Sequence, residues 1–160
     1  MDRIVAVTGL GAVTPIGQNA PETWAAMVAG KNGIAPLTRF DTTEFKAKLA
    51  AEVKDFDPVA FGISKGDVRK LDLFSQYALA AAKEAVDDSG VVGTLESERL
   101  GVYIGSGIGG ISTLMTEHSK LLDGGPRKIS PFFVPMMIIN MASGMVAKTY
   151  GARGVCLPIV

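Results

Sequence analysis

The sequence predicts an α/β fold in which helices cover the faces of a sheet of short strands. Three apolar runs with β-branched residues have the length and composition of buried strands, at residues 3–8, 100–105 and 155–160. Segments with apolar residues at helical spacing separate these runs. Such alternation is typical of a layered α/β architecture. No internal repeat or interdomain linker divides the 160 residues, so we expect one domain.

The first strand leads into a turn and a short helix. Residues 3–8 (RIVAVT) end at Gly9 and Gly11, which mark a turn after a buried strand. Pro21 suits the first turn of a helix, because its fixed backbone angle is already helical, and Gly30 can end that helix. We therefore expect a strand, a glycine turn and a short helix in this part of the chain.

The middle of the chain predicts one half-exposed strand and the clearest helix. Residues 48–53 alternate in polarity, which favours a strand at a sheet edge, and the apolar side consists of Leu49, Ala51 and Val53. Residues 69–88 carry apolar side chains at helical spacing and end before Gly90. The apolar positions of this helix are Leu71, Phe74, Ala78, Ala81 and Ala85.

Two further helices precede the last strand. The first covers residues 111–122, and the second runs from about Pro135 to Gly151. Pro158 removes one donor from the strand at residues 155–160, which favours a sheet edge or a bulge. The apolar stripe of the first of these helices consists of Ile111, Leu114, Met115, His118, Leu121 and Leu122.

Charge balance and cysteine content exclude several classes of protein. The 16 basic and 16 acidic residues cancel, so no global field would attract nucleic acid or an anionic membrane. The longest apolar run, residues 132–139, is too short to cross a bilayer and contains Pro135. The one cysteine, Cys156, cannot form an internal disulfide, and the first residues lack the pattern of a secretory signal. We therefore expect a cytoplasmic protein that does not enter a membrane.

A glycine-rich loop at residues 105–110 (GSGIGG) raises an alternative function. Its spacing between a predicted strand and a predicted helix matches dinucleotide-binding loops, as in a small NAD(P)-dependent oxidoreductase. Such a unit should continue with a strand that ends in an acid about twenty residues further on, whereas Asp123 lies in a turn after a helix. Residues 8–11 (TGLG) resemble another dehydrogenase opening, but Pro15 would interrupt the helix that receives the pyrophosphate. A structural turn is the favoured interpretation of residues 8–11, and the signal at residues 105–110 is weak when taken alone.

Neither the histidine nor the cysteine has the sequence surroundings of a catalytic residue. His118 is the only histidine, and its apolar stripe favours a packed, hydrogen-bonded side chain over a base or a metal ligand. Cys156 lies in a predicted strand without a basic neighbour that would activate its thiol. A basic group, defined as Lys65, Arg69 and Lys70, lies at the start of the long helix and is of interest only if the partner is acidic.

Six segments occur in the order found in one family of enzymes. They are VTGLGAVTPIG at 7–17, TRFDTTEF at 38–45, VKDFDP at 53–58, GSGIGG at 105–110, GGPRKISPFFVPMMIINM at 124–141 and YGARG at 150–154. Together they resemble the N-terminal part of elongating β-ketoacyl-acyl carrier protein synthases, the type II ketosynthases of bacterial fatty-acid synthesis. Each segment alone is unspecific, whereas their ordered combination is highly specific and covers nearly the whole chain.

The resemblance implies a thiolase-like fold, a layered α/β/α/β/α architecture of which residues 1–160 are only the N-terminal part. It implies a cytoplasmic homodimer that uses no cofactor and takes acyl and malonyl groups from an acyl carrier protein. The implied reaction is a decarboxylative Claisen condensation. An acyl group moves to a cysteine, the malonyl group loses carbon dioxide, and the resulting carbanion attacks the thioester.

The resemblance carries over an acyl pocket and a docking surface. Ile108 matches a position that lines the acyl pocket, and Phe133 matches one that reaches this pocket across the dimer interface. Arg69 and Lys70 match basic positions that meet the acidic carrier protein, and Lys65 falls beside a third such position.

No catalytic residue is carried over. In relatives the strand equivalent to residues 155–160 is followed at once by a Thr-Ala-Cys segment, and the catalytic histidines lie further on. Cys156 and His118 match none of these positions. We therefore expect the chain to stop before the nucleophile and to be inactive alone, while the full-length protein is an acyltransferase. Two alternatives stay open, the oxidoreductase described above and a non-catalytic module that binds the carrier protein.

Overall fold

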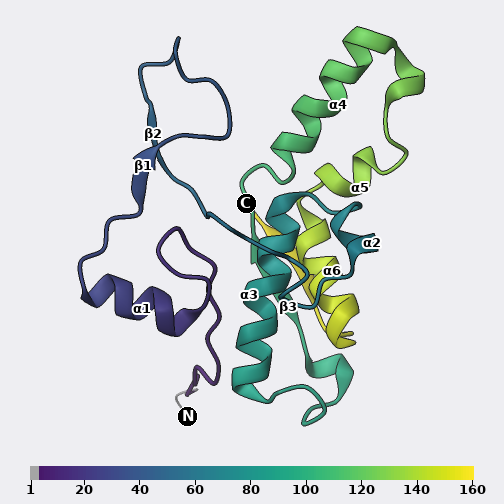
Figure 1. Cartoon of the computed structure of the whole chain (residues 1–160). Coiled ribbons are helices and arrows are strands. Elements are labelled where there is room, and N and C mark those ends of the chain that lie inside the picture. Colours follow the sequence, from purple (N-terminus) through teal and green to yellow (C-terminus); the bar gives the residue numbers. More distant parts are fainter. Residues whose placement is uncertain (1–3) are drawn as a thin grey trace.

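A computed structural model describes residues 4–160 of the chain. At its centre α3 (Leu73–Ser89) packs against α6 (Asn140–Tyr150), and α6 also contacts a parallel strand pair, β3 (Val102–Gly105) and β4 (Cys156–Ile159) (Figure 1). The buried core lies where these elements meet and contains Ile63, Leu71, Leu79 and Val146. The predicted α/β fold is confirmed.

The other elements surround this centre, and some of them form two projections. In chain order they are α1 (Ala20–Val28), β1 (Ile34–Pro36), β2 (Leu49–Ala51), α2 (Lys65–Val68), η1 (Ser97–Arg99), α4 (Ile111–Gly124), η2 (Pro126–Lys128) and α5 (Phe133–Met137). Figure 1 shows the β1–β2 hairpin and α4 projecting toward the same side of the molecule. Among the described residues, no helix combines the length and apolar composition that a bilayer crossing requires.

The parallel pair confirms two of the three strands predicted at the ends and middle of the chain. Val102 lies opposite Cys156, and Ile104 lies opposite Pro158. The chain passes between β3 and β4 through α4, α5 and α6, because parallel strands require a crossover connection. Within the described residues β3 is the only partner of β4, which agrees with the sheet edge expected for a strand that contains proline.

The strand predicted at residues 3–8 is wrong over its described part, residues 4–8. Residues 4–8 form no strand and their apolar side chains are exposed, while Arg3 lies outside the described residues. The next residues are held against α3 instead of beside β3. The N–H of Leu10 donates to Asp88 and that of Ala12 donates to Glu84, each at 2.9 Å. These two bonds direct the segment across the outer face of α3.

The long helix predicted at residues 69–88 begins later than expected. Asp72 is the N-cap of α3, and its carboxylate accepts from the N–H of Phe74 at 3.3 Å. The side-chain amide of Gln76 donates to the carbonyl of Leu71 at 2.8 Å and fixes the break that separates α2 from α3. The end of the helix agrees with the prediction, because Gly90 caps it in the left-handed conformation.

The helix predicted from Pro135 to Gly151 is two helices. α5 ends at Met137, whose carbonyl accepts from the N–H of Gly110 at 2.9 Å. Ile138 is extended, and α6 then begins and runs to a left-handed cap at Gly151. A tertiary hydrogen bond has therefore replaced the helical continuation that periodicity predicted.

The buried face of α4 is not the apolar face that the sequence predicted to be buried. Thr113 and Glu117 are buried, because their polar atoms have partners on other elements. The predicted apolar stripe faces outward, and Met115 is 66% and Leu122 is 73% exposed. His118 is exposed as well, so the expectation of a packed histidine is wrong.

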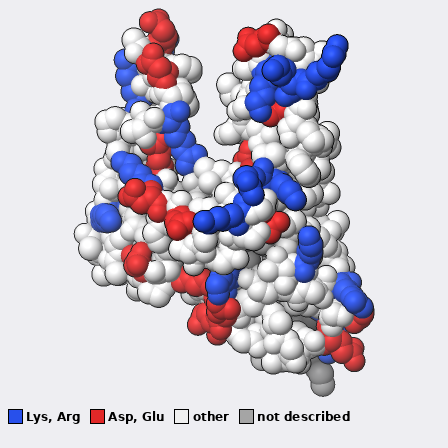
Figure 2. All heavy atoms as spheres, turned by 45° about the vertical axis from the view of Figure 1, so that its right-hand side comes forward, with Lys and Arg blue, Asp and Glu red and all other residues white. Residues whose placement is uncertain are grey.

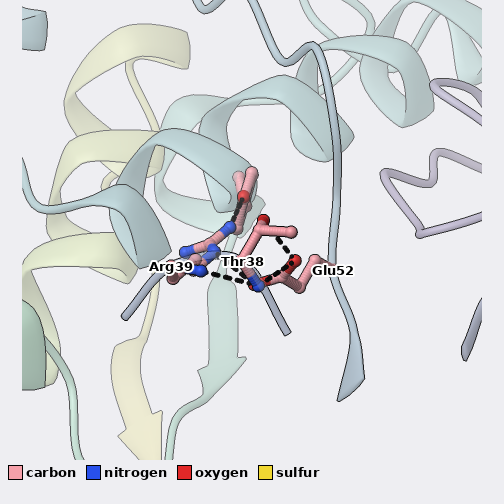
Figure 3. Close-up of polar contacts among 4 residues, drawn as sticks. Thr38, Arg39 and Glu52 are labelled. Atoms are coloured by element: carbon pink, nitrogen blue, oxygen red, sulfur yellow. Dashed lines mark hydrogen bonds and ion pairs between the residues drawn. The ribbon is translucent and has the colours of Figure 1, made fainter. Parts of the chain in front are cut away.

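The strand predicted at residues 48–53 is β2, which pairs antiparallel with β1, a strand that the sequence did not predict. Glu52 is buried at its end and accepts from the hydroxyl of Thr38 at 2.8 Å and from the N–H of Arg39 at 3.2 Å (Figure 3). These bonds, the Thr38 hydroxyl above all, lower the pKa of the Glu52 carboxyl. Arg39 also donates to the hydroxyl of Tyr77 on α3 at 2.9 Å. The base of the hairpin is thereby tied to the centre of the fold.

Candidate functional site

The glycine-rich loop at residues 105–110 joins β3 to α4 and lies against the end of α5. Gly109 has a φ of +79°, which L side chains rarely adopt. A Cβ atom on Gly109 would clash with the carbonyl oxygen of Met137, and one on Gly110 would clash with that of Met136. The glycines are therefore needed for close contact with the chain's own backbone.

The first turn of α4 is already occupied by a carboxylate. Asp72 is buried and accepts from the N–H of Thr113 at 3.0 Å and from its hydroxyl at 2.6 Å. A pyrophosphate in a dinucleotide site would need free N–H groups at this helix start. The loop geometry therefore gives no support to the oxidoreductase alternative.

The second glycine-rich segment, residues 8–11, is also used for internal packing. A Cβ atom on Gly9 or on Gly11 would clash with main-chain atoms of α3. The N–H of Ala20, at the start of α1, donates to Glu84 at 2.8 Å, and the same carboxylate accepts from Ala12. Residues 8–11 therefore pack closely on α3 and leave no space for a pyrophosphate, while the turn of this segment lies further on, at residues 15–16.

The single histidine and the single cysteine lie on different elements, and both are exposed. Cys156 lies in β4 as predicted, with its side chain exposed, and His118 is exposed on α4. Within residues 4–160, no group of three or more His, Cys, Asp or Glu residues could hold a metal ion.

The two predicted acyl-pocket residues lie on segments that are hydrogen-bonded to each other. Ile108 is at the exposed tip of the glycine-rich loop, with 65% of its surface accessible. Phe133 is half-buried at the first position of α5. The bond between Gly110 and Met137 joins these two segments. Two apolar side chains are thus presented from one connected unit, formed by the loop and α5.

The segment that leads into α5 is held by Glu117 of α4. Its carboxylate accepts from the N–H of Ser130 at 2.6 Å and pairs with Lys120 at 2.6 Å. The bond from Lys120 and then the bond from Ser130 lower the pKa of the buried Glu117 carboxyl, although burial acts in the opposite direction. Glu117 is therefore ionised at neutral pH and fixes the start of the segment that carries Phe133.

The basic group of Lys65, Arg69 and Lys70 is exposed in and just after α2. Figure 2 shows basic side chains near the middle of the face that α2 presents and again at the tip of α4, with acidic side chains among them. The Nζ atom of Lys70 lies 5.4 Å from the centre of the ring of Phe132, the residue before Phe133. The structure therefore brings the basic group next to the segment that carries a predicted pocket residue.

Three residues of this region were missed by the sequence reasoning. Asp72 could have been found, because an acid just before a helical run is an N-cap signal. Glu117 left no signal, because it sits beside an apolar stripe that predicts the opposite face as buried. Phe132 left none either, because the contact with Lys70 joins segments that are distant in the sequence.

The chain is similar over nearly its whole length to one protein family and to several curated proteins. Residues 2–160 match the family described as the N-terminal domain of β-ketoacyl synthase. The 3-oxoacyl-[acyl-carrier-protein] synthase 2 of Coxiella burnetii is 48% identical over 159 residues, which are 99% of this chain and 38% of that protein. The protein of the same name from Vibrio harveyi is 47% identical over 153 residues, which are 95% of this chain and 37% of that protein. The chain thus spans less than two fifths of these curated relatives.

Solved structures give the same fold. The ishigamide ketosynthase/chain length factor superposes with a TM-score of 0.84 at 29% identity, over 96% of this chain and 39% of that one. A type II polyketide synthase ketosynthase bound to its acyl carrier protein has a TM-score of 0.68 at 23% identity, over 92% of this chain and 38% of that one. The predicted thiolase-like fold is confirmed.

Proposed function

Since the chain belongs to the β-ketoacyl synthase family, whose N-terminal domain matches residues 2–160, we propose that it contributes this domain to an elongating ketosynthase of fatty-acid synthesis. The observation that carries the proposal is the likeness to two 3-oxoacyl-[acyl-carrier-protein] synthases 2 over nearly the whole chain. The proposed substrates are acyl and malonyl groups on an acyl carrier protein, and the proposed location is the cytoplasm.

The proposed reaction forms a carbon–carbon bond. A cysteine thiolate first takes the acyl group from the carrier, and malonyl-carrier protein then loses carbon dioxide. The electron pair left on the malonyl α-carbon attacks the acyl carbonyl carbon, and the carbon–sulfur bond to cysteine breaks. None of these steps is assigned to Cys156 or His118, because neither matches a catalytic position of the family.

Within this reaction we assign Ile108 and Phe133 to the acyl pocket. Both are apolar, and the hydrogen bond between the loop and α5 joins their backbones in one unit. The resemblance places Phe133 in the pocket of the second protomer, so each pocket would need two chains. A wall of large apolar side chains limits the length of the acyl chain that fits, because close-packed sites do not expand easily.

The basic group is assigned to carrier docking. Lys65, Arg69 and Lys70 are exposed, and their charges would attract an acidic carrier protein over a distance set by ionic strength. The names of the curated relatives support an acyl carrier protein as the partner. Exposed charges act on encounter more than on chemistry, so this group should affect substrate capture.

A homodimer is also part of the proposal. The outward stripe of α4 exposes several large apolar side chains at helical spacing, and exposed apolar surface of this kind often marks an interaction site. Its largest exposed members are Ile111, Leu114, Met115, Leu121 and Leu122. A second copy of the chain is the occupant we assign to this stripe, in line with the position of Phe133.

The test of the function uses the full-length protein that contains residues 1–160, with acyl- and malonyl-carrier protein as substrates. We expect release of carbon dioxide and formation of 3-oxoacyl-carrier protein. Binding of the carrier without turnover would instead support the non-catalytic module, and absence of both would refute the proposal.

Charge reversal tests the docking group separately. Arg69→Glu together with Lys70→Glu should weaken carrier binding at low salt and flatten its salt dependence. Lys31→Glu with Lys46→Glu is the matched control, because both lysines are exposed elsewhere and the net charge changes equally. Equal effects of the two pairs, or unchanged affinity at low salt, would remove the docking assignment.

A further inference from the structure

Phe132 is the N-cap of α5. Its N–H donates to the hydroxyl of Ser130 at 3.1 Å, and its carbonyl accepts from the N–H of Met136 at 2.9 Å. Phe133 follows it as the first residue of the helix. The N–H and the carbonyl of Phe132 are thus both hydrogen-bonded within this segment. If a displacement of the ring moves the backbone of Phe132, the adjacent Phe133 moves with it.

The other end of α5 contacts the loop that carries Ile108. The carbonyl of Met137 accepts from Gly110, and the tight contact with Gly109 leaves no space between loop and helix. A shift of α5 is therefore passed to both proposed pocket residues, since close-packed backbone contacts cannot be compressed.

Of the basic group, Lys70 lies over an aromatic ring, that of Phe132, in the part of the chain that the structure describes. Phe132 is 42% exposed, and Lys70 is exposed as well, so this contact is open to solvent. A cation over a ring at an exposed site shifts an equilibrium by roughly 2- to 5-fold. The contact is thus strong enough to bias the position of the ring and weak enough to be broken by a competing charge.

An acidic partner supplies such a competing charge. The lysine ammonium is a compact charge on a flexible stem, and it turns readily from a ring toward a carboxylate. A carrier protein that engages Lys70 would draw the ammonium away from Phe132 and release the ring.

We propose that Lys70 and Phe132 are positioning residues that link carrier docking to the shape of the acyl pocket. In the absence of the carrier protein, Lys70 lies over the ring of Phe132 and holds α5 in one position. When the carrier protein binds Lys70, Phe132 and Phe133 are free to adjust to the incoming acyl chain. The inference rests on the proposed function, because it takes Lys70 as a docking residue and Phe133 as a pocket residue.

The test compares two kinds of acyl donor in the full-length protein, acyl-carrier protein and carrier-free acyl-pantetheine, each over a series of chain lengths. Lys70→Gln should change the chain-length preference for acyl-pantetheine by about 2- to 5-fold, toward the preference seen with carrier-bound donors. Phe132→Leu should do the same, whereas Lys70→Arg and Phe132→Tyr, which keep a cation over a ring, should preserve the wild-type preference. Lys46→Gln, an exposed lysine of the hairpin, controls for the loss of one charge.

The outcomes separate the link from the function on which it rests. A Lys70→Gln effect confined to the KM of carrier-bound donors would overturn the link and leave the docking assignment standing. Unchanged carrier-bound kinetics in both Lys70→Gln and Arg69→Gln would overturn the docking group, and the link with it. An equal loss of rate at every chain length in Phe132→Leu, with Phe132→Tyr also impaired, would assign the ring a structural role only.

Discussion

Replacing Asp72 should destabilise two helix starts at once. Its buried carboxylate accepts from the N–H of Phe74 at 3.3 Å, from the N–H of Thr113 at 3.0 Å and from the Thr113 hydroxyl at 2.6 Å. Hydrogen bonds to a charged group contribute about 1.5–3 kcal/mol each, and a buried donor left without a partner costs about 1–3 kcal/mol. Because the three bonds share one carboxylate and are not additive, we expect Asp72→Ala to lower the free energy of unfolding by about 3–5 kcal/mol.

Urea unfolding followed by circular dichroism measures this loss. Asp72→Asn keeps one acceptor oxygen and should lose about half as much, near 2 kcal/mol. Asp57→Ala is the control, because Asp57 is exposed and accepts a single local bond from Val59 at 2.9 Å, so it should cost no more than about 1 kcal/mol. A loss below about 1 kcal/mol in Asp72→Ala would refute the assignment of these bonds as major contributors.

Three further outcomes are expected. The pKa of Glu117 is lowered on folding, so its stabilising contribution is present above the ordinary carboxyl value of 4.5 and is lost as pH falls through the folded-state pKa. The melting temperature of the wild type should therefore approach that of Glu117→Gln as pH falls, and a constant difference would contradict this. Ser75→Ala should leave stability unchanged or raise it by up to about 1 kcal/mol in urea unfolding, because the buried Ser75 hydroxyl has no hydrogen-bond partner among the described residues. A marked loss of stability would reveal a partner for this hydroxyl. Ile108→Phe in the full-length protein should reject long acyl chains before short ones, whereas equal loss at all lengths would indicate misfolding.

The sequence predicted local structure where local signals were decisive. The strands around Val102 and Cys156 and the end of α3 at Gly90 follow from apolar runs and a glycine cap. It failed where a tertiary contact overrode periodicity. The carbonyl of Met137 bonds to Gly110 and divides one predicted helix into two, and the polar contacts of Glu117 decide which face of α4 turns inward.

The candidate site also has features that the sequence could predict and features that it could not. The ordered motifs sufficed to predict the family, because motif order is a property of the sequence itself. The roles of Ile108, Phe133 and the basic group stay predictions carried over from that family. The contact between Lys70 and Phe132 could not be predicted, because no periodic pattern records which side chain of one segment lies over which ring of another.

The crossover between β3 and β4 has a consequence for the order of folding. A parallel strand pair gains its ladder only after the intervening chain has been built, and contacts of this kind slow folding because loop closure precedes them. During synthesis β3 emerges well before β4, so it must wait with its edge unpaired while α4, α5 and α6 form. α6 contacts both strands and α3, which makes it the surface on which the pair can assemble. In pulse-labelling hydrogen exchange, the α3–α6 amides should therefore gain protection before the N–H of Val102, which bonds to the carbonyl of Val155 at 2.8 Å, and that of Ser106, which bonds to Ile159 at 3.0 Å.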